Sequence, residues 1–272
     1  MNHTKGLRGM RRAERARLAS EDEAVPRPGR GNVPLVALRV DVAMLTIRGG
    51  TLAIGLVNRT QAPYEGRWSL PGKIVGLDEG LDEAAQRELI DETGLESLPS
   101  RIHLAQIGAY GDPGRDPTTR VVSVAYVALV RNLPEPRHGM YWPVSAVLES
   151  GSANLAFDHS RIIADGVRGV RERLEAAPIA LMFLDEPFTL SELRGVYEAV
   201  WGSPLDPSNF RRKVLASAGF VQPVAERTSA GRSGGRPPQL FQAGKASRLF
   251  PPILRPGLTT NDLHSGNQAH HE

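Results

Sequence analysis

Residues 68–95 read WSLPGKIVGLDEGLDEAAQRELIDETGL and hold seven carboxylates. Three of them, Glu88, Asp91 and Glu92, stand at i, i+3 and i+4 in a predicted helix over residues 82–93, so they share one helix face. Like charges at these positions repel, and they cost stability unless a cation lies among them. Hard oxygen ligands of this kind suit Mg²⁺ or Mn²⁺, which can hold a diphosphate in place. The alternative is an ordinary acidic helix face in contact with solvent.

Glycines bound this predicted helix, and strand-like segments surround it. Gly80 suits an N-cap, and Gly94 suits the left-handed C-cap position. Within residues 36–59, two strand-like segments flank Gly49 and Gly50, which predicts a hairpin with a tight turn. Further strand candidates are residues 96–110 and 120–130. This mixture of strands and helices predicts an α/β (α+β) fold.

The acidic helix and the segment before it share one spacing pattern, carried by Glu79, Arg87, Glu88, Asp91, Glu92, Gly94 and Leu95. This pattern resembles the box of the Nudix family, G-x5-E-x7-R-E-U-x-E-E-x-G-U. The resemblance covers roughly residues 34–150 and includes the preceding RWSLPG. It implies an α/β/α sandwich with a mixed sheet and a loop–helix–loop that binds a divalent metal.

The resemblance also implies roles for the residues of the box. Glu88 and Glu92 are the expected main metal ligands, and they are the catalytic residues if the protein hydrolyses its ligand. Asp91 is the third expected ligand, at a position usually held by Glu. Arg87 is expected to orient the box through ion pairs, with Glu79 supporting it.

One residue departs from the family pattern. The first glycine of the box falls at position 73, where this chain has Lys73. Its ammonium can pair with Glu88 or Glu92 in place of a metal, or it can hold a phosphate directly. Either role favours binding over hydrolysis; the alternative is a lysine that points to solvent.

Further ligand contacts are expected from the segment AYGDPGRDPTTRVVSVAY, which resembles the loop and strand of Nudix proteins that handle ADP-ribose. Tyr110 is expected to stack on an adenine, and Arg115 and Arg120 to meet phosphate or support the box. Arg59 and Lys73 complete the predicted ligand-binding set. The alternative is a surface loop whose arginines are solvated.

The second half begins with a helix predicted over residues 155–177, and a capping box at Thr189 and Glu192 opens a further helix that ends at Gly202. Its apolar positions form one predicted buried stripe: Leu190, Leu193, Val196, Tyr197, Val200 and Trp201.

A second short helix follows, with Asp206 as its N-cap, Pro207 in its first turn and Gly219 as its stop. The residues expected on its buried side are Phe210, Val214, Leu215 and Ala218. The opposite, exposed side is expected to present Asn209, Arg212, Lys213 and Ala216, with Arg211 nearer the edge. Two helices, a short turn and an exposed polar face are typical of a helix-turn-helix, whose second helix enters the major groove.

A Gly/Arg-rich loop between two strand-like segments follows this helix pair and predicts a β wing. Arg227, Arg232 and Arg236 are expected to contact DNA there. Residues 207–248 carry eight Arg or Lys against one acidic residue, whereas the whole chain has a net charge of only +3. This asymmetry favours a partner that is a nucleic acid, the alternative being a solvated basic surface.

The order of these parts resembles the Nudix-related transcriptional regulators of NAD metabolism over about residues 34–243. The resemblance implies a repressor that works as a homodimer on palindromic, double-stranded operator DNA and that ADP-ribose releases. It also implies a cytoplasmic protein, associated with the nucleoid when bound to DNA. The alternative is a metal-dependent ADP-ribose or nucleoside-diphosphate-sugar pyrophosphatase.

Composition and charge along the chain predict the domain boundaries and exclude some kinds of chemistry. We expect a disordered basic tail over residues 1–33, a Nudix domain over 34–152, a winged helix-turn-helix domain over 153–243 and a disordered tail over 244–272. The chain has no cysteine, which excludes thiolate chemistry and disulfides. Its longest apolar run, VVSVAYVALV, suits a buried strand and is too short for a membrane span.

Overall fold

The computed structural model describes residues 35–227 and 238–257. The tail expected over residues 1–33 lies outside these ranges, as do Arg232 and Arg236 of the predicted wing. The predicted hairpin is confirmed: β1 (Ala37–Arg48) pairs antiparallel with β2 (Thr51–Asn58), and their turn holds Gly49 and Gly50 at φ 57° and 76°. Positive φ at both central positions suits glycine and matches the twist of the two strands.

The larger sheet has the strand order β3-β2-β1-β6-β5, with β4 paired to β1 and β7 paired to β2. The added strands are β3 (Trp68–Ser69), β4 (Gly72–Ile74), β5 (His103–Tyr110), β6 (Val121–Leu129) and β7 (Gly139–Pro143). The central pair β1 and β6 runs parallel, and the other pairs are antiparallel, so the sheet is mixed as expected.

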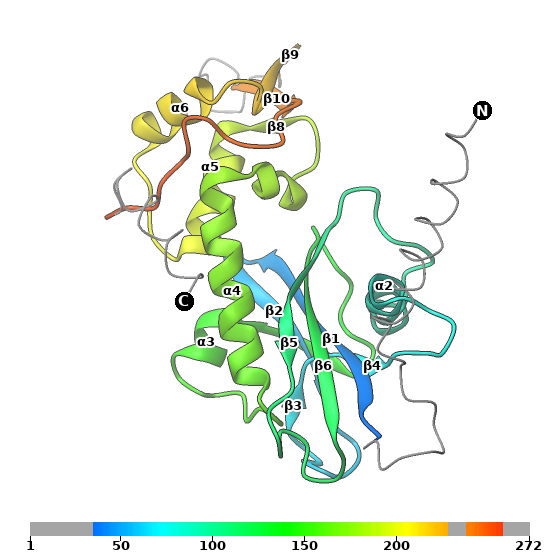
Figure 1. Ribbon diagram of the computed structural model, residues 1–272. Coiled ribbons are helices and arrows are strands. Elements are labelled where there is room, and N and C mark those ends of the chain that lie inside the picture. Colours follow the sequence, from blue (N-terminus) through cyan, green and yellow to red (C-terminus); the bar gives the residue numbers. More distant parts are fainter. Residues whose placement is uncertain (1–34, 228–237, 258–272) are drawn as a thin grey trace, which may run out of the picture. The chain divides into compact units, whose positions relative to one another are not determined.

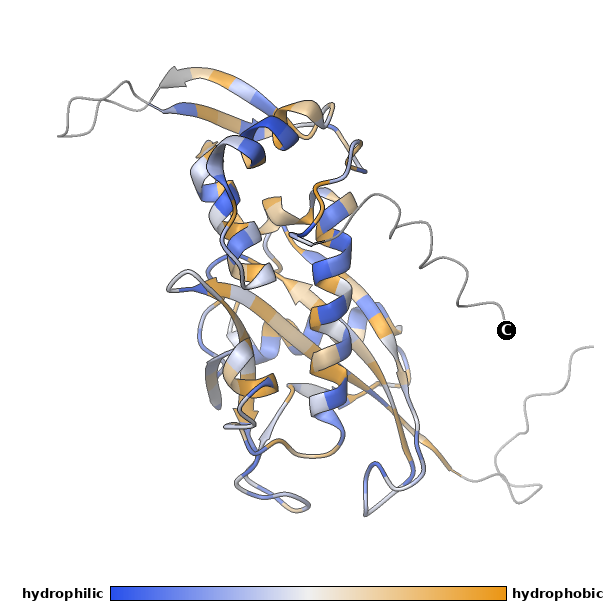
Figure 2. Ribbon diagram, turned by 90° about the vertical axis from the view of Figure 1, so that its left-hand side faces the viewer, coloured by the Kyte–Doolittle hydropathy of each residue, from blue (hydrophilic) through white to orange (hydrophobic). Residues whose placement is uncertain are grey.

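Helices cover both faces of this sheet (Figure 1). On one face α2 (Leu81–Thr93) buries Ala84, Ala85 and Leu89 against β1 and β6. On the other face lie α3 (Val144–Leu148) and α4 (His159–Ala176), where hydrophobic residues alternate with hydrophilic ones along α4 (Figure 2). The arrangement is the predicted α/β/α sandwich. The end signals of α2 are also confirmed, because Gly80 is its N-cap and Gly94 is a left-handed C-cap at φ 69°.

The second half of the chain folds as a winged helix. Its elements are the 3-10 helix η1 (Pro178–Phe183), β8 (Phe188–Thr189), α5 (Leu190–Trp201), α6 (Pro207–Ala216), β9 (Val221–Arg227) and β10 (Gln239–Ala243). The three strands form one antiparallel sheet in the order β8-β10-β9. The Thr189 capping box is present, and all six predicted apolar residues of α5 are buried.

The buried side of α6 differs in part from the sequence prediction. Phe210 and Val214 are buried, but Leu215 is 50% exposed and Ala218 is also exposed. Ala218 lies beyond the helix, which ends at Ala216, and Leu215 lies about 140° around the helix axis from Phe210, at the edge of the buried side. Ser217 is buried in their place, and its hydroxyl donates a 2.6 Å hydrogen bond to the carbonyl of Pro251.

Residues 244–257, which the sequence assigns to a disordered tail, pack against α4. The backbone N–H groups of Leu249 and Ile253 donate to the carbonyls of Ala176 and Glu175 at 2.8 and 2.9 Å. Both apolar side chains are buried, so these two residues anchor the segment. Residues 258–272 lie outside the described part of the chain. Within that part, no helix has the length and apolar character needed to cross a bilayer.

Candidate ligand pocket and nucleic-acid interface

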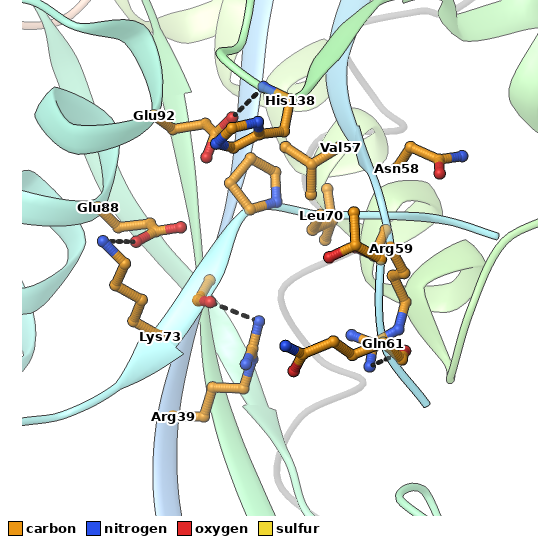
Figure 3. A pocket seen from close by; sticks show the side chains of 14 residues that line it. Arg39, Val57, Asn58, Arg59, Gln61, Leu70, Lys73, Glu88, Glu92 and His138 are labelled. Carbon is orange, nitrogen blue, oxygen red and sulfur yellow. Dashed lines mark hydrogen bonds and ion pairs between the residues drawn. The ribbon is translucent and has the colours of Figure 1, made fainter. Parts of the chain in front are cut away.

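An open pocket of about 370 Å³ lies between the end of β2, strand β4 and the face of α2 that carries Glu88 and Glu92. Its walls come from β1 and β2, the β3–β4 region, the acidic helix α2 and His138 just before β7 (Figure 3). The lining residues are Arg39, Val57, Asn58, Arg59, Thr60, Gln61, Ser69, Leu70, Pro71, Gly72, Lys73, Glu88, Glu92 and His138.

Lys73 contacts two of the three clustered carboxylates. Its Nζ lies 2.6 Å from Oδ2 of Asp91 and 3.4 Å from Oε2 of Glu88. Glu92 takes a different partner, because its Oε1 accepts a 3.2 Å hydrogen bond from the backbone N–H of His138. The expected ion pair of Lys73 is thus present with Glu88 and extends to Asp91, whereas Glu92 is not its partner.

The surroundings shift the pKa values of these groups in opposite directions. Burial raises the pKa of Glu88, although the nearby Lys73 ammonium opposes this shift. The hydrogen bond between Lys73 and Asp91 lowers the pKa of Asp91 and raises that of Lys73. Lys73 is therefore held in its charged form beside the box.

Arg87 and Glu79 support the box as the family resemblance implies. The Arg87 guanidinium donates from Nε and Nη2 to the two Glu79 oxygens at 2.9 and 2.6 Å, in a bidentate pair. Glu79 also accepts from the backbone N–H of Gly76, and the two interactions lower its pKa to about 2. The loop before α2 is therefore fixed to the helix.

Two arginines supply positive charge to the pocket. Arg39 donates to the carbonyl of Gly72 at 2.6 Å and to Asp41 at 2.7 Å, so its guanidinium is held in place. Arg59 donates to the carbonyl of Pro63 at 2.8 Å, and its guanidinium lies 4.7 Å from the ring centroid of Phe157. Burial, together with repulsion from Arg39, lowers the pKa of Arg59. Of these two, sequence reasoning found Arg59 and missed Arg39.

Behind Arg39 lies a buried polar cluster that sequence reasoning also missed. Asp41 accepts from the hydroxyl of Ser123, and its Oδ2 lies 3.7 Å from Nε2 of His159. Nδ1 of His159 accepts a 2.8 Å hydrogen bond from the backbone N–H of Leu70. Burial lowers the pKa of His159 to about 4, so the imidazole is neutral at pH 7. The only available signal was Asp41 itself, a charged residue within the apolar strand LRVDVAML.

The structure places three predicted ligand residues away from this pocket lining. Tyr110 is buried on β5, and its hydroxyl donates to Asp165 on α4 at 2.9 Å. Arg115 is buried in a bidentate pair with Asp158, at 3.0 and 2.6 Å. Arg120 is exposed at the end of the loop over residues 112–120.

The candidate nucleic-acid interface is the exposed side of α6. Asn209, Arg211 and Arg212 are exposed there, and Arg212 donates to Oδ1 of Asn209 at 2.8 Å. Lys213 is half-buried, and its Nζ lies 3.5 Å from the carbonyl of Leu254. Arg227 ends strand β9, which pairs with β10 as one arm of the wing.

These features define a Nudix domain followed by a winged helix of the DNA-binding type. Comparison with known families agrees: residues 37–163 match the NUDIX domain, and residues 180–243 match the NrtR DNA-binding winged helix domain. The chain is 30% identical to the ADPR responsive transcriptional repressor NtrR of Acinetobacter baylyi over 238 residues, which cover 84% of this chain and 90% of that protein. The chain belongs to the NrtR family, which confirms the resemblance read from the sequence.

Solved structures show the same relationship. Shewanella oneidensis NrtR complexed with a 27mer DNA is 28% identical, with a TM-score of 0.66, and the match covers 80% of this chain and 99% of that chain.

A further sequence relative is an ADP-ribose pyrophosphatase of Methanocaldococcus jannaschii, which is 31% identical over 118 residues. That match covers 42% of this chain and 64% of the pyrophosphatase.

Proposed function

We propose that this protein is a transcriptional repressor that ADP-ribose releases from its operator. The winged helix binds double-stranded DNA, and the Nudix pocket binds the effector. The name of the Acinetobacter relative, an ADPR responsive transcriptional repressor, supports both parts. The Shewanella relative bound to a 27mer DNA supports the first part. From the family resemblance, we infer that the regulated genes serve NAD metabolism.

The exposed side of α6 is the observation that carries this proposal. Phe210 and Val214 fix the helix to the core, so Asn209, Arg211 and Arg212 face outward near its N-terminal end. The early residues of a recognition helix are those that meet base edges in the major groove. Arginine and asparagine are the side chains suited to bidentate contacts with guanine and adenine.

The pocket chemistry suits the diphosphate of ADP-ribose. Three cationic side chains, Arg39, Arg59 and Lys73, line one opening. Arginine matches the geometry of phosphate oxygens, and lysine supplies a point charge. We propose Tyr110 and Arg115 as supports of the surrounding structure, because Tyr110 contacts Asp165 of α4 and Arg115 contacts Asp158, the N-cap of α4, whereas Arg120 is exposed outside the pocket lining.

Helix α4 gives the pocket a physical link to the winged helix. Its first residue, His159, accepts the hydrogen bond from Leu70 in the pocket wall. Nearer its C-terminal end, Arg171 donates to the carbonyl of Val200, and Trp201 of α5 donates back to the carbonyl of Arg171. We propose that effector binding shifts this helix and that the shift weakens DNA binding.

We propose that the protein binds palindromic operators as a homodimer, because two-fold symmetric proteins match two-fold symmetric sites. Such a repressor acts in the cytoplasm on nucleoid DNA. The domain boundary near residue 152 and the roles of Arg232 and Arg236 in the wing remain part of the proposal.

A fluorescence anisotropy titration tests the proposed function. The full chain is titrated onto DNA from upstream of NAD-biosynthesis genes, and then ADP-ribose, NAD or AMP is added at fixed salt, since salt alone changes such affinities strongly. We expect specific binding that ADP-ribose weakens roughly 5- to 150-fold, the usual range of allosteric coupling. DNA binding that is insensitive to ADP-ribose would contradict the sensor role, and equal affinity for scrambled DNA would contradict the repressor role.

Hydrolysis is the second candidate function, favoured by the retained carboxylates of the box and by the Methanocaldococcus pyrophosphatase. Mg²⁺-dependent release of AMP from ADP-ribose tests it, with Glu92→Gln as the control. Turnover above the level of this variant would support an enzymatic role, and turnover at that level would remove it.

A further inference from the structure

The Nudix family implies a divalent cation at the box, and the carboxylates of this chain do not fit one. Within residues 35–227 and 238–257, no group of three or more His, Asp or Glu side chains is arranged to hold a metal ion. Asp91 and Glu88 contact the ammonium of Lys73, while Glu92 accepts the backbone N–H of His138. The three expected ligands therefore already have two different partners.

Lys73 reaches the carboxylates without backbone strain. It lies in β4 opposite Val40 of β1, within a regular antiparallel pair. From there its side chain extends to α2, and it is still 45% exposed toward the pocket. An ammonium has three N–H donors. One donates to Asp91 at 2.6 Å, and Glu88 lies within ion-pair distance at 3.4 Å, so the ammonium retains donor capacity for a phosphate oxygen.

We propose that the Lys73 ammonium replaces the divalent cation of the box and that the protein binds its effector without metal. The cation relieves the repulsion between Glu88 and Asp91, the role that a metal has in the family. It also presents positive charge to the pocket beside Arg39 and Arg59. The identity of the ligand in this inference rests on the proposed function, whereas the replacement of the metal by Lys73 is testable without ADP-ribose.

Mn²⁺ binding to the full chain, followed by electron paramagnetic resonance, tests the replacement directly. The wild-type protein should leave Mn²⁺ free in solution, because Lys73 occupies the carboxylates. Lys73→Gly restores the glycine of the box and frees Glu88 and Asp91, so it should bind one Mn²⁺. Adding Glu88→Gln to Lys73→Gly should abolish that binding, and Lys245→Ala, at an exposed lysine, should behave as the wild type.

Tight Mn²⁺ binding by the wild-type protein that Glu88→Gln abolishes would overturn the proposal. Absence of Mn²⁺ binding by a folded Lys73→Gly variant would also overturn it, because the lysine would then not be what excludes the metal. Circular dichroism checks that each variant is folded. These outcomes do not depend on whether ADP-ribose is the effector.

Calorimetric titration of the wild-type protein with ADP-ribose tests the consequence for the ligand. We expect the same dissociation constant in EDTA and in Mg²⁺, and a loss on the order of tenfold in Lys73→Met, which removes one charged hydrogen bond. A requirement for Mg²⁺ would overturn metal-free binding. If ADP-ribose does not bind under either condition, the proposed function fails, and the Mn²⁺ measurement still decides the role of Lys73.

Discussion

The backbone N–H of Leu70 donates a 2.8 Å hydrogen bond to Nδ1 of His159. Leu70 belongs to the pocket wall, and His159 is the first residue of α4. A protonated imidazole has no lone pair on Nδ1, so this contact requires the neutral form. The contact therefore joins the ligand pocket, the long helix and the protonation state of one buried side chain.

The stability of the protein should fall as the pH is lowered from about 6.5 to about 4, because the pKa of His159 is lowered to about 4 from its usual 6.5. The unfolded chain binds a proton across this window and the folded protein does not, so acid favours unfolding. The loss is roughly 3 kcal/mol at the lower end. Urea unfolding across this range measures it. His159→Gln retains an acceptor for Leu70 without titrating, and an equally steep fall in that variant would refute the assignment.

Arg212→Ala should weaken operator binding by about 1–3 kcal/mol while leaving scrambled DNA nearly unchanged, if Arg212 makes a bidentate base contact. Arg211→Ala should weaken both DNAs alike and reduce the salt dependence by about one counterion, as expected for a phosphate contact. Anisotropy at several salt concentrations separates the two effects. Arg67→Ala, at an exposed arginine of the Nudix half, is the matched control. An Arg212→Ala variant with unaltered discrimination would exclude its role in base readout.

Ile253→Ala should lower the free energy of unfolding by about 2–4 kcal/mol, because the side chain is buried and its loss leaves a cavity. Its backbone N–H also anchors residues 244–257 to Glu175 of α4. Leu215→Ala removes a leucine that is 50% exposed and should cost less than about 1 kcal/mol. Chemical denaturation of both variants checks the contrast. Equal costs would mean that the C-terminal segment contributes no core packing.

Gly72→Ala should disrupt the pocket. A Cβ at this position would lie 2.2 Å from Oδ1 of Asp41 and 2.4 Å from the carbonyl of Val40, so β4 would move away from β1. Overpacking of this kind costs about 1–3 kcal/mol. The displaced strand also carries Lys73, so ADP-ribose binding should weaken in the same variant. Thermal unfolding and calorimetry measure the two effects; unchanged values of both would show that the strands tolerate the methyl group.

The sequence predicted those elements whose ends carry local signals. Gly80 and Gly94 bound α2, and the Thr189–Glu192 capping box opens α5, as expected. These signals act over a few residues, so a single chain reveals them. The side of α6 was harder to predict, because the helix stops at Ala216, two residues earlier than expected, which leaves Ala218 outside it, and because Leu215 at the edge of the buried side is exposed.

Contacts between distant segments could not be predicted in the same way. Asp41, Ser123 and His159 come from β1, β6 and α4, and only the folded sheet brings them together. Tyr110 lies in a sequence pattern typical of ligand-binding loops, but in the folded protein its hydroxyl donates a hydrogen bond to Asp165. For Lys73, charge alone left Glu88 and Glu92 as equivalent partners, and the path of β4 selected Glu88 together with Asp91.

One hydrophobic cluster includes Leu45 of β1, Val170 of α4, Phe210 of α6 and Phe241 of β10. Two domains joined by a linker would each keep a core of their own, and recombination could exchange either one. Here an exchange of the winged helix alone would leave apolar residues of α4 without their packing partners. Descendants of this chain would therefore acquire new operator preferences through substitutions on the exposed side of α6, and the sensor and the DNA reader would be inherited together.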